Sequence, residues 1–135
     1  MLELILGTVF LIYLLFIGQL IYGFNRMRRF SKTEFTPKTS FTIVVPFRNE
    51  KENLPNLLHS ISLLHYPKKL VEVILVDDDS EEVFSVQHSV FSLKVIKNER
   101  KSNSPKKDAI ETAIQIAKND WIITTDADCL VQKDW

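Results

Sequence analysis

The feature that most constrains the fold of this chain is an uncharged apolar run near the N-terminus, from Leu4 to Phe24. A helix of about 21 residues spans about 31 Å, which matches the hydrocarbon core of a bilayer. The run has no polar face, so it does not suit the core helix of a soluble domain. A cleavable signal peptide is the alternative, but the run is too long for one and lacks preceding basic residues and a small-residue cleavage site. The sequence therefore predicts a retained transmembrane helix within residues 1–24.

The charges beside this run predict its orientation. One acidic residue, Glu3, precedes the run, and the basic residues that follow it are Arg26, Arg28, Arg29 and Lys32. Because positive charge stays on the cytoplasmic side of a membrane, we expect a single-pass protein with its N-terminus outside. Residues 25–40 are polar and are interpreted as a juxtamembrane linker. The domain after them is predicted to lie in the cytoplasm, as at a bacterial inner membrane.

The composition excludes two classes of protein. The chain of 135 residues carries 17 basic and 17 acidic side chains. It therefore lacks the basic excess with which a general nucleic-acid binder neutralises phosphates. A single cysteine, Cys129, excludes an internal disulfide framework and a Cys-rich zinc site.

Apolar strands and amphipathic helices alternate in residues 41–135. The segments FTIVV, VEVILV and WIITT are short β-branched runs, which are typical of buried strands. The predicted strands are 41–45, 71–76, 93–97 and 121–125, and the predicted helices are 49–66, 81–90 and 104–118. Strands that alternate with helices form a parallel sheet with right-handed crossovers. The sequence thus predicts an α/β fold, in which a Rossmann-like parallel sheet is flanked by helices.

Three of these strands end in polar clusters, at residues 46–50, 77–80 and 126–128. Open parallel sheets bind ligands at the carboxyl ends of their strands, so the three clusters predict one shared site. No glycine-rich phosphate loop is present in the sequence, which leaves a metal ion or side chains to hold any phosphate. The pair Asp126 and Asp128 suits a hard cation such as Mg²⁺ or Mn²⁺. An ordinary polar turn after the strand is the alternative.

Asp78 and Lys106 are further candidates for this site. Asp78 follows a buried strand and could accept a hydrogen bond from a base or a ribose, or could instead cap the next helix. Lys106 and Lys107 open a predicted helix, where positive charge opposes the helix dipole, so a nearby anionic ligand would explain them. The alternative is a solvated charge run, and we interpret most of the basic residues between 97 and 107, Arg100 among them, in that way.

Three motifs together resemble the family 2 glycosyltransferases of the GT-A type. FTIVVPFRNE (41–50) resembles the first-strand signature, and VEVILVDDDS (71–80) resembles the Val-Asp-Asp-Gly-Ser segment. SPKKDAIETAI (104–114), followed by WIITTDADC (121–129), is similar to the Gly-Lys-x-x-Ala-Leu helix and the DxD strand. The order and the spacing of the motifs agree with the family, and the resemblance covers residues 41–135.

The resemblance implies a transferase that uses a nucleotide-diphospho-sugar and Mg²⁺ or Mn²⁺, with a glycan or a lipid as acceptor. The implied nucleotide-sugar-binding residues are Pro46, Asn49, Glu50, Asp78, Lys106 and Asp126, and the implied metal ligands are Asp126 and Asp128. Asp78 would face the base, Lys106 would approach the phosphates, and Asp128 would bind the metal that bridges the diphosphate. The family continues well past the DxD strand. Residues 41–135 are therefore interpreted as a truncated donor-binding half, with the catalytic base expected after Trp135.

The chain departs from the family pattern at three positions. Asp79 and Pro105 stand where glycine is usual, and Arg48 stands where an aromatic residue is often found. Three other interpretations remain open. They are a noncatalytic membrane-anchored nucleotide-binding fragment, a receiver-type signalling domain, and a sugar nucleotidyltransferase, although the last would require a glycine-rich loop after the first strand.

Overall fold

The structure, a computed structural model, describes residues 1–27, 36–85 and 89–135. The chain divides into two compact units, residues 1–35 and residues 36–135. The first unit contains helix α1, Leu2–Arg26, and none of the side chains of α1 is buried in protein. In length and composition α1 could cross a membrane, although a signal sequence near the N-terminus has the same properties. Arg28, Arg29 and Lys32, on which the predicted orientation depends, lie outside the described residues.

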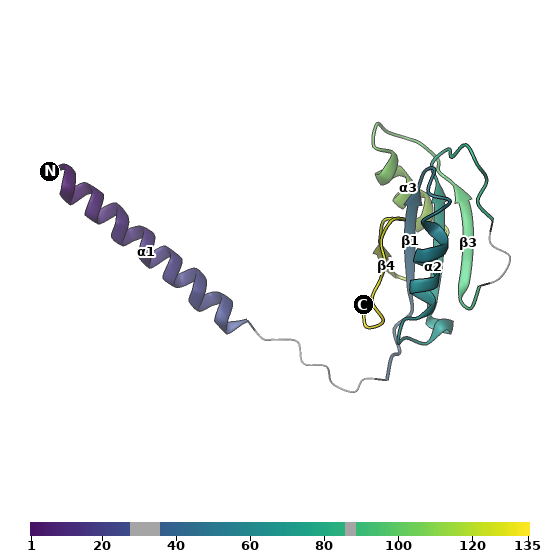
Figure 1. Ribbon diagram of the computed structural model, residues 1–135, viewed down its shortest axis with the longest axis horizontal. Coiled ribbons are helices and arrows are strands. Elements are labelled where there is room, and N and C mark those ends of the chain that lie inside the picture. The colour runs from purple at the N-terminus through teal and green to yellow at the C-terminus, as the bar shows by residue number, and fades with distance from the viewer. Residues whose placement is uncertain (28–35, 86–88) are drawn as a thin grey trace. The chain divides into compact units, whose positions relative to one another are not determined.

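The second unit is built on a parallel sheet of four strands, as far as the described residues show (Figure 1). The strands are β1 (Phe41–Phe47), β2 (Val71–Asp77), β3 (Ser92–Lys97) and β4 (Trp121–Thr124), in the spatial order β3-β2-β1-β4. Phe41 at the start of β1 lies opposite Val71 on one side and Trp121 on the other. This arrangement confirms the predicted α/β fold. It differs from the order 2-1-3-4-5 of receiver domains and so contradicts that alternative.

One helix covers each face of the sheet. Helix α2, Leu54–Ser62, packs on one face, and helix α3, Pro105–Ile114, packs on the other. Buried residues on the α2 side include Ile43, Val45, Leu54, Leu57, Ile61, Val73 and Leu75. Those on the α3 side are Val44, Ile74, Val76, Ala109 and Ala113. Because both faces are covered, the central strands bury successive residues, which is why their sequences are continuous apolar runs.

The predicted helix 81–90 is wrong for the part of it that the structure describes, residues 81–85 and 89–90; residues 86–88 lie outside the described part. A helix here would place Val83 and Val90 on one face, but both side chains are exposed and no surface covers them. The chain instead runs irregularly, and Phe84 meets Phe47 edge-on, with 6.2 Å between the ring centroids. Helix α2 is shorter than predicted. It begins at Leu54, with Pro55 in its first turn where a missing N–H costs nothing.

Strand β1 continues through Pro46, where the sequence predicted that it would end. In a parallel sheet, the backbone groups of successive residues point alternately to the two neighbouring strands. The carbonyl of Phe47 accepts a hydrogen bond from the N–H of Asp78 on the β2 side. Pro46 therefore faces the β4 side, where β4 has already ended at Thr124. The missing N–H of Pro46 consequently removes no bond from the sheet.

Candidate functional site

The order in which the chain adds strands to the sheet changes side at β1. From β1 the chain adds β2 and then β3 on one side, and it returns to place β4 on the other side. In open α/β sheets, the crevice outside the carboxyl ends of the strands at such a switch point is where ligands bind. A hollow of about 240 Å³ lies here; its lining residues are Pro46, Phe47, Arg48, Glu50, Asp126, Ala127 and Asp128.

A second hollow, of about 210 Å³, adjoins the first one. It is lined by Pro46, Phe47, Arg48, Asp78, Pro105 and Lys106. The two hollows share residues 46–48 at the end of β1, so we describe them together as the β1 groove. Asp78 and Lys106 lie in one part of the groove, and Asp126 and Asp128 lie in the other. Six of the seven residues predicted for the site line this groove.

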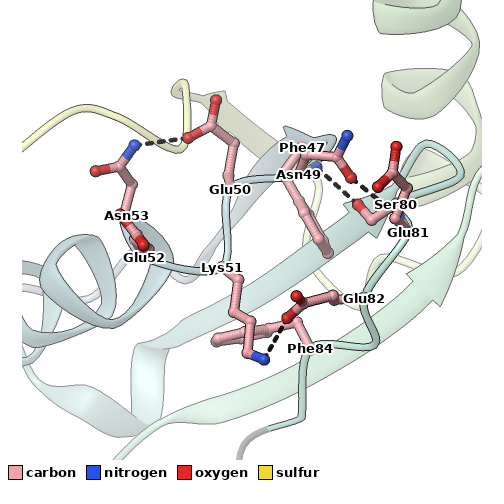
Figure 2. Close-up of a pocket in the computed structure, with 10 residues that line it drawn as sticks. All are labelled: Phe47, Asn49, Glu50, Lys51, Glu52, Asn53, Ser80, Glu81, Glu82 and Phe84. Carbon is pink, nitrogen blue, oxygen red and sulfur yellow. Dashed lines mark hydrogen bonds and ion pairs between the residues drawn. The ribbon is translucent and has the colours of Figure 1, made fainter.

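Asn49, the seventh predicted residue, lines a larger hollow of about 350 Å³, shown in Figure 2. Its N–H donates to Ser80 Oγ at 2.9 Å, and its Oδ1 accepts from the N–H of Glu81, also at 2.9 Å. Asn49 therefore ties the loop after β1 to the loop after β2. Its φ of 56° lies in the left-handed region, which asparagine tolerates better than most residues.

The turn after β2 explains one departure from the family pattern. Asp79 has a φ of 67°, in the left-handed region that glycine adopts without steric cost. Asp79 thus takes the conformation of the glycine usual at this position. The N–H of Ser80 is bound by Asp77 Oδ1 at 2.9 Å, which closes the turn from within. The turn is therefore kept despite the substitution.

Asp78 is held by two residues that the sequence did not single out for the site. Arg100 donates from Nε to Oδ1 and from a terminal nitrogen to Oδ2, both at 2.7 Å, and Asn98 Nδ2 donates to Oδ1 at 2.7 Å. The bonds from Arg100, despite partial burial, hold the pKa of Asp78 below its ordinary value. Arg100 is therefore a fixed partner of the site, where a solvated charge was predicted. The helix-capping alternative for Asp78 fails because no helix follows it within residues 79–85.

Lys106 reaches the acidic end of the β1 groove. Its Nζ lies 2.6 Å from Asp126 Oδ1, and both side chains are more than half exposed. Pro105, which replaces the usual glycine, lies in the first turn of α3, where proline is tolerated. The lysine therefore lies beside the DxD pair, as a ligand for phosphate would require. An exposed pair of this kind contributes little to stability.

Asp108 lies behind the groove and fixes the loop that carries Asn98 and Arg100. It is 1% exposed, and it accepts hydrogen bonds from the N–H groups of Lys101 and Ser102 and from Ser102 Oγ at 2.7 to 2.9 Å. These bonds, led by the one from the Ser102 N–H, lower the pKa of Asp108. The sequence signal that could have indicated the burial of Asp108 was its spacing. Asp108 and Thr112 lie four residues apart on α3, next to the buried Ala109 and Ala113.

Stability is expected to fall in acid because of these two aspartates. A carboxyl whose pKa is lowered by folding stabilises the protein fully above its unfolded pKa, near 4, and loses that contribution as the pH falls through the lower folded value. We therefore expect similar melting temperatures at pH 7 and pH 5.5, and a clear drop at pH 3. The variant Asp108→Asn should show a smaller drop between pH 5.5 and pH 3. An equal drop in the variant would assign the acid sensitivity to other groups.

The oxygen ligands of the groove suit a hard divalent cation. Asp126 and Asp128 come from one turn after β4, and Glu50 lines the same hollow. Magnesium is commonly held by one or two carboxylates together with substrate phosphates, and this donor set provides the carboxylates. Within the described residues, no group of three or more His, Cys, Asp or Glu side chains is close enough to hold a metal ion alone. The carboxylates of the groove would therefore suit a cation that takes its remaining ligands from a bound phosphate.

The strand order and the polar groove at the switch point define a Rossmann-like α/β unit. The family model "Glycosyl transferase family 2" matches residues 42–135. The chain belongs to this family, which confirms the resemblance found in the motifs.

Relatives and solved structures extend the comparison. The poly(ribitol-phosphate) beta-N-acetylglucosaminyltransferase TarS of Staphylococcus aureus (strain MW2) is 28% identical over 98 residues, which are 70% of this chain and 17% of TarS. A crystal structure of TarS in complex with UDP-GlcNAc matches with a TM-score of 0.58 and 27% identity, over 70% of this chain and 28% of that one. The mannosyltransferase PcManGT of Pyrobaculum calidifontis, in complex with GDP-Man and Mn²⁺, matches with a TM-score of 0.57 and 24% identity, over 70% and 29%. The likeness to PcManGT, at 24% identity, is one of fold alone.

The chain spans less than a third of the length of these relatives.

Proposed function

We propose that residues 41–135 form the donor-binding half of a glycosyltransferase that uses a nucleotide-diphospho-sugar. The observation that carries this proposal is the β1 groove, in which Asp78 and Lys106 share one cavity system with the pair Asp126 and Asp128 at the switch point. Family 2 membership and the UDP-GlcNAc complex of TarS give independent support. The proposed acceptor is a glycan or a lipid.

The groove is divided between the two ends of the donor. Asp78 receives the base, because a carboxylate anchored by Arg100 offers a fixed acceptor. Lys106 and the turn at Asp126–Asp128 receive the diphosphate. Asp126 and Asp128 would hold Mg²⁺ or Mn²⁺, which would supply positive charge beside the diphosphate of the donor. Lys106 adds positive charge beside Asp126, 2.6 Å from its carboxylate, where the phosphates would lie.

Transfer requires a base that takes the proton of the acceptor hydroxyl. We expect that base outside residues 1–135, in an acceptor-binding half of the kind that the length of the relatives implies. A nucleotide-binding fragment without transferase activity would use the same groove. Assays of sugar transfer from UDP-sugars and GDP-sugars to glycan and lipid acceptors distinguish the two. Transfer by this chain alone would contradict the expected position of the base.

Helix α1 is proposed to anchor this unit as a single-pass membrane span, with its N-terminus outside and the nucleotide-binding unit in the cytoplasm. Its uncharged composition and length support a span. The basic residues that follow the run, Arg26, Arg28, Arg29 and Lys32, support this orientation. Labelling in intact cells of Leu2→Cys in a Cys129→Ser background tests it, because Cys129 is itself a free and exposed thiol. An impermeant reagent reaches the introduced cysteine only if the N-terminus is outside.

The test of the proposed function is nucleotide binding by the full chain in detergent micelles. With Mn²⁺ present, we expect UDP or GDP to bind, and we expect Asp128→Ala to weaken that binding at least about tenfold because a ligand of the shared cation is lost. The matched control is Asp120→Ala, which removes an exposed aspartate at the opposite end of β4 and should leave binding unchanged. Binding that is independent of metal and unchanged in Asp128→Ala would overturn the role of the DxD pair.

A further inference from the structure

The carboxylate of Asp78 has little capacity left for a ligand. An ionised carboxylate offers about four lone-pair positions, two on each oxygen. Oδ1 accepts from both Arg100 and Asn98, and Oδ2 accepts from Arg100, so three positions are filled. Among the described residues no further donor reaches Asp78. One acceptor position therefore remains, and it is on Oδ2.

One partner of Asp78, Asn98, is itself fixed in place by two further hydrogen bonds. The second Nδ2 hydrogen of Asn98 is directed to the carbonyl of Pro105 at 3.1 Å, and the N–H of Asn98 is bound to the carbonyl of Asp77 at 2.8 Å. Arg100 uses two of its five N–H groups on Asp78, which leaves the others beside the remaining acceptor position. A base that meets Asp78 therefore finds one acceptor with guanidinium donors next to it.

The two candidate bases differ in what they present to such a group. Uracil offers one imide N–H between two carbonyl oxygens. Guanine offers two adjacent donors, N1–H and the 2-amino group, which together require an acceptor on each oxygen of a carboxylate. With Oδ1 already filled, the guanine amino group would face donors instead of an acceptor and would lose the hydrogen bond that it makes in water, which is costly.

We propose that Arg100 and Asn98 are the residues that determine base choice, and that by filling all but one acceptor position of Asp78 they select uridine over guanosine diphosphates. The inference rests on the proposed function, in which Asp78 receives the base. Arg100 acts as a positioning residue. It affects the base through the carboxylate of Asp78, whose acceptor positions it occupies.

The first test uses the unmodified full chain in micelles with Mn²⁺ and three nucleotides. We expect UDP to bind at least about tenfold more tightly than GDP, because one unpaired polar group produces discrimination of that order. 3-Methyluridine diphosphate, which lacks the imide hydrogen, should lose at least about tenfold relative to UDP for the same reason. GDP binding as tight as UDP, or tight binding of the methylated nucleotide, would overturn the inference and leave the proposed function intact.

The second test asks whether Arg100 sets the preference. Arg100→Gln returns acceptor positions on both oxygens of Asp78, so the UDP to GDP affinity ratio should fall to within about threefold of one. Lys101→Gln removes a charge from the neighbouring position and should keep the ratio of the unmodified chain. A purely structural role for Arg100 would weaken both nucleotides together and preserve the ratio, which would overturn the inference. Binding of neither nucleotide to the unmodified chain would overturn the proposed function and this inference with it.

Discussion

Replacing Asp108 by alanine is expected to lower the melting temperature of the α/β unit, residues 36–135, by about 10 °C. The side chain is buried, and its loss leaves the N–H groups of Lys101 and Ser102 without their acceptor. Both bonds are partly buried, so water would replace the lost acceptor only in part, and donors left without a partner away from water are costly. Thermal unfolding of the full chain in micelles, followed by circular dichroism, measures the change.

The matched control for this prediction is Glu111→Ala on the same helix. Glu111 is exposed and forms a surface ion pair with Lys107 at 3.5 Å, so its loss should change the melting temperature by less than about 3 °C. Asp108→Asn keeps one acceptor oxygen and should fall between the two. Equal melting temperatures for Asp108→Ala and Glu111→Ala would contradict the structural role of Asp108.

The same substitution connects stability to binding. Asp108 holds the loop after β3, and this loop carries Arg100 and Asn98, which in turn hold Asp78. Loosening the loop should therefore weaken nucleotide binding even below the melting temperature. Nucleotide present in excess should raise the melting temperature of the unmodified chain more than that of Asp108→Ala, since at a given concentration a ligand that binds the folded state more tightly stabilises it more.

The strands and the place of the groove could be predicted from the sequence because their signals are local. Each central strand is a continuous apolar run, and the carboxyl ends of parallel strands meet at one edge of the sheet. Asp78 and Asp126 directly follow such runs, so they could be placed in the groove without a structure. Segment 81–90 has no equivalent signal. The sequence predicted a helix there although Val83 and Val90 have nothing to pack against.

The partners of these residues could not be found in the same way. Arg100 lies in an irregular loop, where charge alone gives no direction, and its contact with Asp78 depends on the adjacent positions of β2 and β3. Asp108 lies beside Lys107 on a helix and resembles a surface residue in sequence. Its burial follows from the packing of α3 against the sheet, which brings the loop of Lys101 and Ser102 over it. Contacts of this kind depend on tertiary structure.

Glu72 is a second charged residue hidden in an apolar pattern, and its removal is expected to be at least as damaging. It lies within β2 and is 2% exposed. Oε2 accepts from Thr42 Oγ1 at 2.8 Å and from the N–H of Lys118 at 2.9 Å, and Oε1 lies 3.0 Å from Lys94 Nζ. Burial alone would raise the pKa of Glu72, but the hydrogen bonds from Lys118, Thr42 and Lys94 outweigh it and lower the pKa. The carboxylate is therefore ionised in the folded protein at neutral pH.

Glu72→Ala should lower the free energy of unfolding by about 3 kcal/mol, the usual scale for breaking a buried pair by removing one partner. Glu72→Gln keeps the shape and one acceptor oxygen, so it should cost less at pH 7. Because the pKa of Glu72 is lowered by folding, its charge stabilises the protein above pH 4.5 and that contribution is lost as the pH falls further. The difference between the unmodified chain and Glu72→Gln should therefore shrink between pH 7 and pH 3. A difference that is constant with pH would mean that the network uses Glu72 for its shape and hydrogen bonds, and that the charge contributes nothing.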